Sequence, residues 1–454
     1  MSNLSAGTVA VITLGCEKNT VDSEVIGGML TRRGVRMEAD AERAETIIVN
    51  TCGFIDHAKK ESIGAILEAI ELKKQGVVRK VYVAGCLSER YRSELETEMP
   101  EVDRFFGTQD FEQILSAVIP ESKFDFQHNL LGERQPSTPR HFAYLKISEG
   151  CDHPCSFCAI PLMRGGHRSR NIEELEFEAM VLASNGAKEL VLIAQDSTNY
   201  GLDLYGERAI AKLLARLARI SSIEWIRLMY AYPAKFPLDL LDVMAGEEKI
   251  VNYLDMPVQH ASTAVLKSMR RGITRRATED LIGRIRDRVP GIALRTTLIT
   301  GYPTEGEREF EELEEFVREM QFDRLGVFTY SQEESTSAHP LGDPIPQEVK
   351  IERQARLYDV QSEISLAKNL AKIGSIERVL IESVAQTSVC DPSPVGDEDG
   401  HKLKFVLQGR TAAHAPEVDG EVRVYSNRDL EIGEFVSARI TGGDEYDLEG
   451  IVIS

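Results

Sequence analysis

The residues with the clearest chemical potential are three cysteines in the short segment Cys151-Asp-His-Pro-Cys155-Ser-Phe-Cys158. Iron-sulfur clusters are held by thiolates, normally four for each 4Fe-4S cluster. No fourth cysteine follows nearby, so the spacing predicts a cluster with one iron free to bind a small molecule. Structural zinc is the alternative, but zinc sites usually combine two pairs of Cys or His ligands, and no second pair follows here. His153 is expected to be an ordinary loop residue.

Three further cysteines each come just after a short apolar run. Cys16 follows residues 9–14, Cys52 follows 46–50 and Cys86 follows 81–84, and helical patterns continue over 21–33 and 58–74. The carboxyl ends of parallel strands meet at one edge of an open α/β sheet, where these cysteines would converge. The repeated unit therefore predicts a second metal site. For any single cysteine, an ordinary buried thiol is the better interpretation.

Composition limits the class of protein and of partner. A chain of 454 residues with 42% hydrophobic residues is long enough for about three globular domains. It has neither a signal-peptide pattern nor the roughly 18 apolar residues of a membrane span, so we expect a cytoplasmic protein without a membrane partner. Seven cysteines are too few for a disulfide framework. The net charge of −20 repels phosphate and favours a basic protein partner over naked nucleic acid.

The chain is predicted to be an α/β protein of three domains. Residues 7–120 should form an open parallel α/β sheet, 121–140 a Pro/Ser-containing linker, 141–374 a partial (β/α)6 barrel resembling a TIM barrel, and 375–454 a small antiparallel β-barrel. The helix expected over 347–373 is rich in Lys, Arg and Glu, which indicates a mostly solvated connector. Six apolar runs are the expected strands of the central barrel: 143–147, 189–194, 225–229, 253–256, 293–299 and 324–329.

Other candidate site residues lie at or near the expected ends of the central strands, where barrel enzymes place their sites. Gln195, Gln259, His260 and Arg295 are candidate ligand or substrate contacts, although hydrogen bonding within loops explains a Gln or His there equally well. Asp196 and Arg164 are weaker candidates, and Cys390 is expected to be an incidental thiol. Residues 375–454 hold seven Lys and Arg against sixteen Asp and Glu, a net charge of −9, which argues against phosphate binding.

The cysteine segments resemble those of a known family. Cys-x-x-x-Cys-x-x-Cys with Phe157 before the last cysteine resembles the signature of the radical S-adenosylmethionine (SAM) superfamily. That resemblance implies that SAM binds the open iron and is cleaved reductively to a 5'-deoxyadenosyl radical. Three N-terminal segments, Leu14-Gly-Cys-Glu-Lys-Asn19, Asn50-Thr-Cys-Gly-Phe54 and Gly85-Cys-Leu-Ser-Glu-Arg-Tyr91, are similar to those of the methylthiotransferases. This resemblance implies an auxiliary 4Fe-4S cluster on Cys16, Cys52 and Cys86, and a C-terminal barrel of the TRAM type.

Two branches of that family modify different substrates, an aspartate of small-subunit ribosomal protein S-twelve or an isopentenylated adenosine of tRNA. Gly-Cys-Glu-Lys-Asn and Pro161-Leu-Met-Arg-Gly165 resemble the ribosomal-protein branch, and so do 194–201, 227–233 and 415–420. The acidic composition agrees, because ribosomal proteins are basic. The altered segment Gly301-Tyr-Pro-Thr-Glu-Gly306 and the unusual His414 are interpreted as drift in exposed loops.

The resemblance implies a two-stage reaction. One SAM methylates a sulfur of the auxiliary cluster, and a second SAM is the radical source that activates the β-carbon of the aspartate to receive the methylthio group. The implied cofactors are two 4Fe-4S clusters and SAM, and the implied partners are ribosomal protein S-twelve, bound through the acidic TRAM domain, and a low-potential electron donor. No direct tRNA substrate is expected. A tRNA methylthiotransferase and a non-catalytic ribosome assembly factor with structural clusters are the alternatives.

Overall fold

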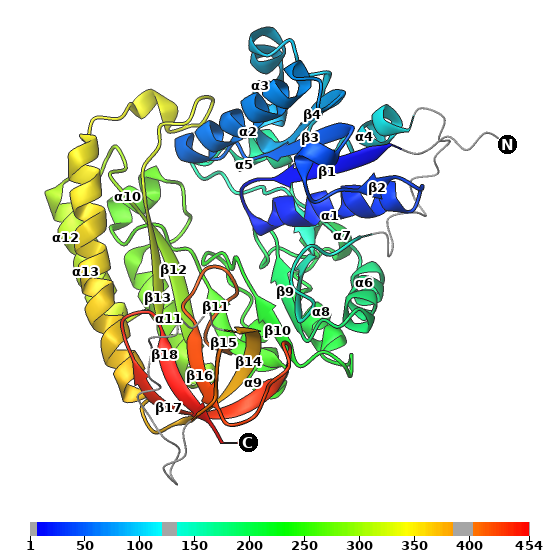
Figure 1. Cartoon of the computed structure of the whole chain (residues 1–454). Coiled ribbons are helices and arrows are strands. Elements are labelled where there is room, and N and C mark those ends of the chain that lie inside the picture. Colours follow the sequence, from blue (N-terminus) through cyan, green and yellow to red (C-terminus); the bar gives the residue numbers. More distant parts are fainter. Residues whose placement is uncertain (1–6, 120–133, 385–402, 454) are drawn as a thin grey trace.

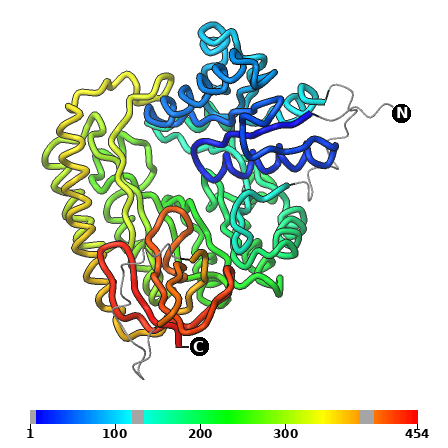
Figure 2. The backbone as a smooth tube through the Cα atoms, in the orientation of Figure 1, coloured from blue at the N-terminus to red at the C-terminus, as the bar shows by residue number. Residues whose placement is uncertain are grey.

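The computed structural model describes residues 7–119, 134–384 and 403–453. Within these residues the chain forms an N-terminal sheet, a central sheet and a C-terminal barrel (Figure 1). The N-terminal part and the C-terminal barrel lie near opposite ends of the central strands (Figures 1 and 2). Cys390 and residues 121–133 of the predicted linker lie outside the described residues, and the domain boundaries stay predictions.

The N-terminal sheet is parallel, in the order β2-β1-β3-β4-β5. Its central strand β3 is buried at every position, as expected for a parallel strand covered on both faces. The three predicted units of strand, cysteine and helix are confirmed as elements. They are β1 (Thr8–Thr13) with α1 (Glu17–Thr31), β3 (Thr46–Thr51) with α2 (Asp56–Lys74), and β4 (Lys80–Gly85) with α3 (Cys86–Glu98), accompanied by β2 (Arg36–Met37), η1 (Ala41–Arg43), β5 (Arg104–Phe105) and α4 (Phe111–Val118).

The central sheet has six parallel strands in the order β13-β12-β11-β10-β9-β6, which is the predicted partial barrel. It is open, with β6 and β13 at its edges. The strands are β6 (Phe142–Lys146), β9 (Glu189–Ile193), β10 (Trp225–Leu228), β11 (Ile250–Asp255), β12 (Ala293–Thr300) and β13 (Arg324–Thr329). The short β7 (Ser148–Glu149) and β8 (Arg168–Ser169) pair separately, and the helices between strands are α5 (Ile160–Arg164), α6 (Ile172–Ser184), α7 (Leu202–Tyr205), α8 (Ile210–Leu217), α9 (Asp239–Gly246), α10 (Thr263–Ser268), α11 (Arg275–Arg288) and α12 (Glu307–Met320).

The two faces of the central sheet bury different side chains. On one face, Leu145, Leu192 and Leu254 pack with the helices in the largest apolar cluster. On the other face, Trp225 and Tyr253 belong to a cluster that also takes residues from α1 and from the C-terminal barrel. Alternating residues of a strand point to opposite faces, so each strand serves both clusters. The second face is thus the one that joins the three parts of the protein.

The helix expected to be a solvated connector is instead part of the barrel wall. α13 (Gln347–Ala371) packs along β13 and α12 and buries one face. The buried face includes polar residues that find partners: Lys350 binds Asp343, Arg353 binds Glu305 at 2.6 Å, and Gln361 donates to the Phe322 carbonyl at 2.9 Å. A buried helix face that contains hydrogen-bonded polar groups shows no clear apolar period. For this reason the composition of the segment predicted a solvent-exposed helix. The short η3 (His339–Leu341) precedes this helix.

The C-terminal barrel is closed, as predicted, but it is not purely antiparallel. Its strands are β14 (Ile376–Val384), β15 (Phe405–Thr411), β16 (Val422–Ser426), β17 (Phe435–Gly443) and β18 (Leu448–Val452). β16 pairs in parallel with β18. The strand between them in the sequence, β17, pairs instead with β14 and β18. The barrel docks on the central sheet through a buried ion network in which Glu189 of β9 binds Arg410 and Arg227, each at 2.7 Å.

Candidate functional site

Cys151, Cys155 and Cys158, here called the loop trio, lie on one loop between β7 and α5. The Cys151 N–H donates to the Gly165 carbonyl at 3.0 Å, and the Ser156 N–H donates to the Met269 carbonyl at 3.0 Å. These bonds fix the loop at the carboxyl end of β6. Burial raises the pKa of Cys151 and of Cys158 to about 12, so the thiols hold their protons until a metal displaces them.

A cation and an aromatic ring stand beside the loop trio. Arg271, which is only 5% exposed, donates from one terminal nitrogen to the Cys155 sulfur at 3.4 Å. Its guanidinium lies 4.2 Å from the ring centroid of Tyr232, and that ring stacks on His153 at 3.6 Å. His153 also binds Asp196 at 2.6 Å, so it is a fixed part of the site rather than an ordinary loop residue. The Nε of Arg271 is buried without a partner among the described residues, which leaves a donor for a bound group.

Cys16, Cys52 and Cys86, here called the assembled trio, come from the carboxyl ends of β1, β3 and β4. Cys16 is the N-cap residue of α1, and Cys86 is the first residue of α3. A Cβ atom on Gly15, the neighbour of Cys16, would lie 3.0 Å from the Cys52 sulfur. Burial, opposed by Arg164 and assisted by Cys16 and Cys52, raises the pKa of Cys86 to about 12. The structure therefore brings the three predicted residues together. Their binding of a metal stays a prediction.

Two glycines make this convergence possible. Gly15 has φ +92° and Gly85 has φ +96°, backbone conformations that L side chains rarely adopt. A Cβ atom on Gly15 would lie 2.7 Å from the Cβ of Cys52, and one on Gly85 would lie 2.5 Å from the carbonyl oxygen of Thr51. The absence of a side chain at these positions lets the strand ends approach closely enough for the thiols to meet.

The donor types of both trios are compatible with iron-sulfur clusters. Across 7–119, 134–384 and 403–453, no three His, Cys, Asp or Glu side chains are close enough to hold one metal ion together. A cubane cluster binds each thiolate through a different iron, so its ligands stand farther apart. Soft thiol donors and a cation beside Cys155 both fit such a group.

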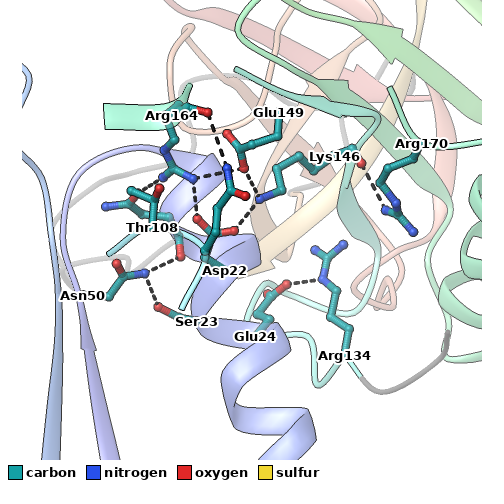
Figure 3. Close-up of polar contacts among 12 residues, drawn as sticks. Asp22, Ser23, Glu24, Asn50, Thr108, Arg134, Lys146, Glu149, Arg164 and Arg170 are labelled. Carbon is teal, nitrogen blue, oxygen red and sulfur yellow. Dashed lines mark hydrogen bonds and ion pairs between the residues drawn. The ribbon is translucent and has the colours of Figure 1, made fainter. Parts of the chain in front are cut away.

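The two trios are joined by a buried polar network, shown in Figure 3. Arg164, at the end of α5, donates to Asp22 of α1 at 2.6 Å and to Glu149 at 3.2 Å, and it also bonds Asn19. Lys146 binds the same two carboxylates. Arg164 was a weak candidate from sequence, and Asp22, Lys146 and Glu149 were not candidates at all. Only the docking of α1 on the central sheet makes them neighbours.

A second connection joins the N-terminal part to the opposite edge of the central sheet. Glu333, in the loop after β13, is 3% exposed and binds Lys59 of α2 and Arg90 of α3, each at 2.7 Å. At the β6 edge, the described end of the predicted linker is held by α1, because Glu24 binds Arg134 and accepts the Ser137 N–H at 2.6 Å. The N-terminal part is thus fixed at both edges of the open sheet.

The remaining candidate residues differ in whether their polar atoms already have protein partners. Gln195 donates to Glu149 at 2.8 Å, and its carbonyl oxygen is buried without a partner among the described residues, so it can receive a ligand donor. Gln259 pairs its backbone with Thr297 and Ile299 at 2.9 and 2.8 Å. Both ring nitrogens of His260 already have protein partners, Glu305 at 3.0 Å and the Ser262 N–H at 2.9 Å.

Two expectations about position are wrong. Arg295 is the third residue of β12 and not at a strand end; it binds Asp255 at 2.9 Å and Asp419 of the C-terminal barrel at 3.5 Å. It therefore serves the contact between the central sheet and the barrel. His414 and Tyr302 are fully buried and do not lie in exposed loops, whereas Thr304 and Gly306 of the altered segment are exposed as expected. Burial of His414 lowers its pKa well below the usual value, and its partner Arg324 lowers it further.

Comparison with known proteins defines the class first. Three family models match: the uncharacterized protein family UPF0004 over residues 8–107, the radical SAM superfamily over 145–317 and the TRAM domain over 373–453. With the six-stranded sheet and the loop trio, these matches define a radical SAM enzyme, and that superfamily implies SAM and a 4Fe-4S cluster. No helix in the described part of the chain has the length and apolar character needed to cross a membrane.

Full-length relatives then define the family. The chain is 50% identical over 449 residues to "Ribosomal protein uS12 methylthiotransferase RimO" of Flavobacterium psychrophilum, covering 99% of this chain and 98% of the relative. It is 50% identical over 447 residues, 98% of each chain, to the protein of the same name from Chloroherpeton thalassium. The chain belongs to the RimO family of ribosomal protein uS12 methylthiotransferases.

Solved structures of low sequence identity share the fold. The radical SAM methyltransferase TsrM from Kitasatospora setae aligns with a TM-score of 0.53 at 13% identity, covering 73% of this chain and 77% of that one. The cobalamin-dependent radical enzyme OxsB aligns with a TM-score of 0.51 at 14% identity, covering 77% of this chain and 56% of that one. At such identities the likeness concerns the fold alone.

Proposed function

We propose that this protein transfers a methylthio group to the β-carbon of an aspartate in ribosomal protein uS12, with one SAM as methyl donor and a second as radical source. The main support is the near-complete similarity to relatives named for that reaction. The loop trio would hold the radical SAM cluster, and the assembled trio would hold a second 4Fe-4S cluster. Because the substrate is a ribosomal protein, we expect the reaction to take place in the cytoplasm.

The structure supports separate parts for the two trios within one site. When bound, the cluster and SAM at the loop trio supply the radical, and the cluster at the assembled trio supplies the sulfur. The chain itself holds the two centres at a fixed separation: α5 starts two residues after Cys158 and packs Met163 against Cys86. The network of Arg164 and Asp22 closes the same interface. Fixed placement matters because a radical reacts with whatever lies nearest to it.

We further propose that the acidic TRAM barrel attracts uS12 and that a low-potential protein supplies electrons. The net charge of −9 over residues 375–454 favours a basic protein and disfavours tRNA. At the barrel's contact with the central sheet, Asp419 accepts from the Tyr253 hydroxyl at 2.7 Å, so some of its acidic groups are used internally. The exposed remainder is available for a partner.

One comparison tests the proposal against its enzymatic alternative. Ribosomal protein uS12 is analysed by mass spectrometry, and tRNA nucleosides by chromatography, in cells with and without this gene. We expect the methylthio group of uS12 to disappear without the gene and tRNA to be unchanged. Loss of a methylthio group from tRNA alone would overturn the proposal.

A second experiment tests catalysis itself. The protein is reconstituted anaerobically with iron and sulfide, then given SAM, a reductant and uS12. An enzyme of the proposed kind forms 5'-deoxyadenosine and methylthiolated uS12. A ribosome assembly factor with structural clusters would form neither product. The Cys151→Ala variant, which lacks one proposed ligand of the radical SAM cluster, is the negative control.

A further inference from the structure

Lys18 lies close to Cys16 and contacts the loop that follows β10. It belongs to the first turn of α1, two residues after Cys16, and its ammonium nitrogen lies 3.0 Å from the ring centroid of Tyr230. Tyr230 follows the end of β10, and it also interacts electrostatically with Cys16. Lys18 is only 7% exposed. The side chain therefore reaches from the assembled trio to the mouth of the central barrel.

The backbone at Tyr230 is strained. Its φ is +63°, an unusual value for a bulky residue, and its N–H donates to the buried carboxylate of Asp255 at 3.2 Å. Such strain persists where the surroundings impose it, and it clusters at ligand sites. Here it turns the ring of Tyr230 under the ammonium of Lys18.

Three buried cations line this interface, and they differ in how fully they are paired. Arg164 and Lys146 each bind two carboxylates, those of Asp22 and Glu149. Lys18 binds one, that of Glu17, at 2.8 Å. An ammonium group has three N–H donors, so Lys18 retains the capacity to bind a further anion. The cation–π contact with the Tyr230 ring holds the ammonium group of Lys18 in place when no such anion is bound.

A carboxylate that enters this protein needs such a partner. The chain carries a net charge of −20, and an unpaired negative charge in a buried site is costly. The target side chain must lie between the radical source and the sulfur source, and Lys18 extends from beside Cys16 to Tyr230 at the carboxyl end of β10. We propose that Lys18 is a specificity-determining residue that pairs with the carboxylate of the target aspartate. This inference rests on the proposed function.

The test is a cycle of two changes, one in the enzyme and one in the substrate. kcat/KM for methylthiolation is measured for Lys18→Met and for uS12 whose target aspartate is replaced by asparagine, singly and together. A charge-assisted hydrogen bond of ordinary strength predicts that each single change lowers kcat/KM by roughly 10- to 100-fold. The double change should lower it little further, since both remove the same pair. Lys18→Arg should retain part of the activity.

Controls separate this pairing from general damage. Lys74→Met removes a lysine that also has a single carboxylate partner, Glu101 at 2.9 Å, but at the far end of α2; it should leave kcat/KM unchanged. Iron content and 5'-deoxyadenosine formation without substrate should be the same in Lys18→Met and the wild type. If Lys18→Met loses iron, Lys18→Arg and the substrate change still carry the test.

The inference fails if the losses from the two single changes multiply, or if Lys18→Met acts equally on both substrates. Failure of the proposed function looks different, because the wild-type enzyme would then form no methylthiolated uS12. A wild-type enzyme that works on aspartate and asparagine alike would also overturn the pairing, while leaving the proposed function intact.

Discussion

The loop trio and the assembled trio each bring three thiols together, but they do so in different ways. Cys151, Cys155 and Cys158 belong to one segment, so local backbone geometry alone brings them near one another. Cys16, Cys52 and Cys86 are up to 70 residues apart and meet only because three parallel strands end together. A site within one loop depends on its loop, whereas a site built from strand ends depends on the whole sheet. The two sites should therefore fail in different ways.

The largest effect is expected from removing one ligand of each trio. Cys151→Ala should abolish both 5'-deoxyadenosine and methylthiolated uS12, because the radical source is lost. Cys52→Ala should abolish the product and leave reductive cleavage of SAM intact, because only the sulfur source is lost. Liquid chromatography with mass spectrometry measures both products in one reaction. Loss of cleavage in Cys52→Ala would contradict separate roles.

The next largest effect should come from the glycines that only the assembled trio needs. Gly85→Ala places a Cβ 2.5 Å from the Thr51 carbonyl oxygen in a backbone region reserved for glycine, a strain of about 1–3 kcal/mol before the clash is counted. We expect the reconstituted protein to bind half the iron of the wild type and still cleave SAM. Gly76→Ala is the matched control: it has φ +75° but no neighbour within 4 Å of the added Cβ. Equal iron content in the two variants would refute the distinction.

A smaller effect on product formation, though not on stability, should come from loosening the interface that holds the trios at a fixed separation. Glu333→Gln leaves Lys59 and Arg90 without their shared carboxylate, and breaking a buried pair costs about 3–5 kcal/mol. Hydrogen exchange should be faster in α3, and the ratio of 5'-deoxyadenosine to product should rise as radicals miss their target. Glu101→Gln, which breaks an exposed pair that solvent screens, should have little effect on stability and leave this ratio unchanged.

The smallest effect concerns the loop trio alone. Arg271 donates to the Cys155 sulfur at 3.4 Å, and a nearby positive charge favours the reduced, more negative cluster. At a given potential, Arg271→Met should lower the ratio of reduced to oxidised cluster about tenfold. For one electron this corresponds to a midpoint potential about 59 mV lower. Electron paramagnetic resonance during a redox titration measures this in a Cys52→Ala background, where one cluster remains. Arg270→Met, whose exposed side chain contacts Ser337, is the control. An unchanged midpoint potential in Arg271→Met would show that Arg271 does not favour the reduced cluster.

Sequence predicted the sites where a residue's neighbours along the chain determine its place. Cys151, Cys155 and Cys158 have a diagnostic spacing, and Cys16, Cys52 and Cys86 follow apolar runs that parallel strands require. It could not predict Glu333, which meets Lys59 across 274 residues, or Arg164, which meets Asp22 across 142. These polar partners have no periodic signal, since each is satisfied only by tertiary contact.

The errors have similar physical causes. The buried face of α13 carries Lys350 and Arg353, so its composition resembles that of an exposed helix. The predicted strand 293–299 begins where β12 begins, so Arg295 lies near the amino end of that strand. Its contact with Asp419 of the C-terminal barrel is tertiary and leaves no signal in the sequence. The parallel pair of β16 and β18 depends on the order in which strands close a barrel, and periodicity carries no information on that order.

The attachment of the N-terminal part to both edge strands limits how the domains can be exchanged. Asp22 meets Lys146 at the β6 edge, and Lys59 and Arg90 meet Glu333 beyond the β13 edge. A chimera that grafts this N-terminal part onto another radical SAM barrel would leave these charges buried and unpaired unless their partners moved with it. In this protein the N-terminal part and the central barrel therefore form one unit for domain exchange, because the residues that join them have to be exchanged together.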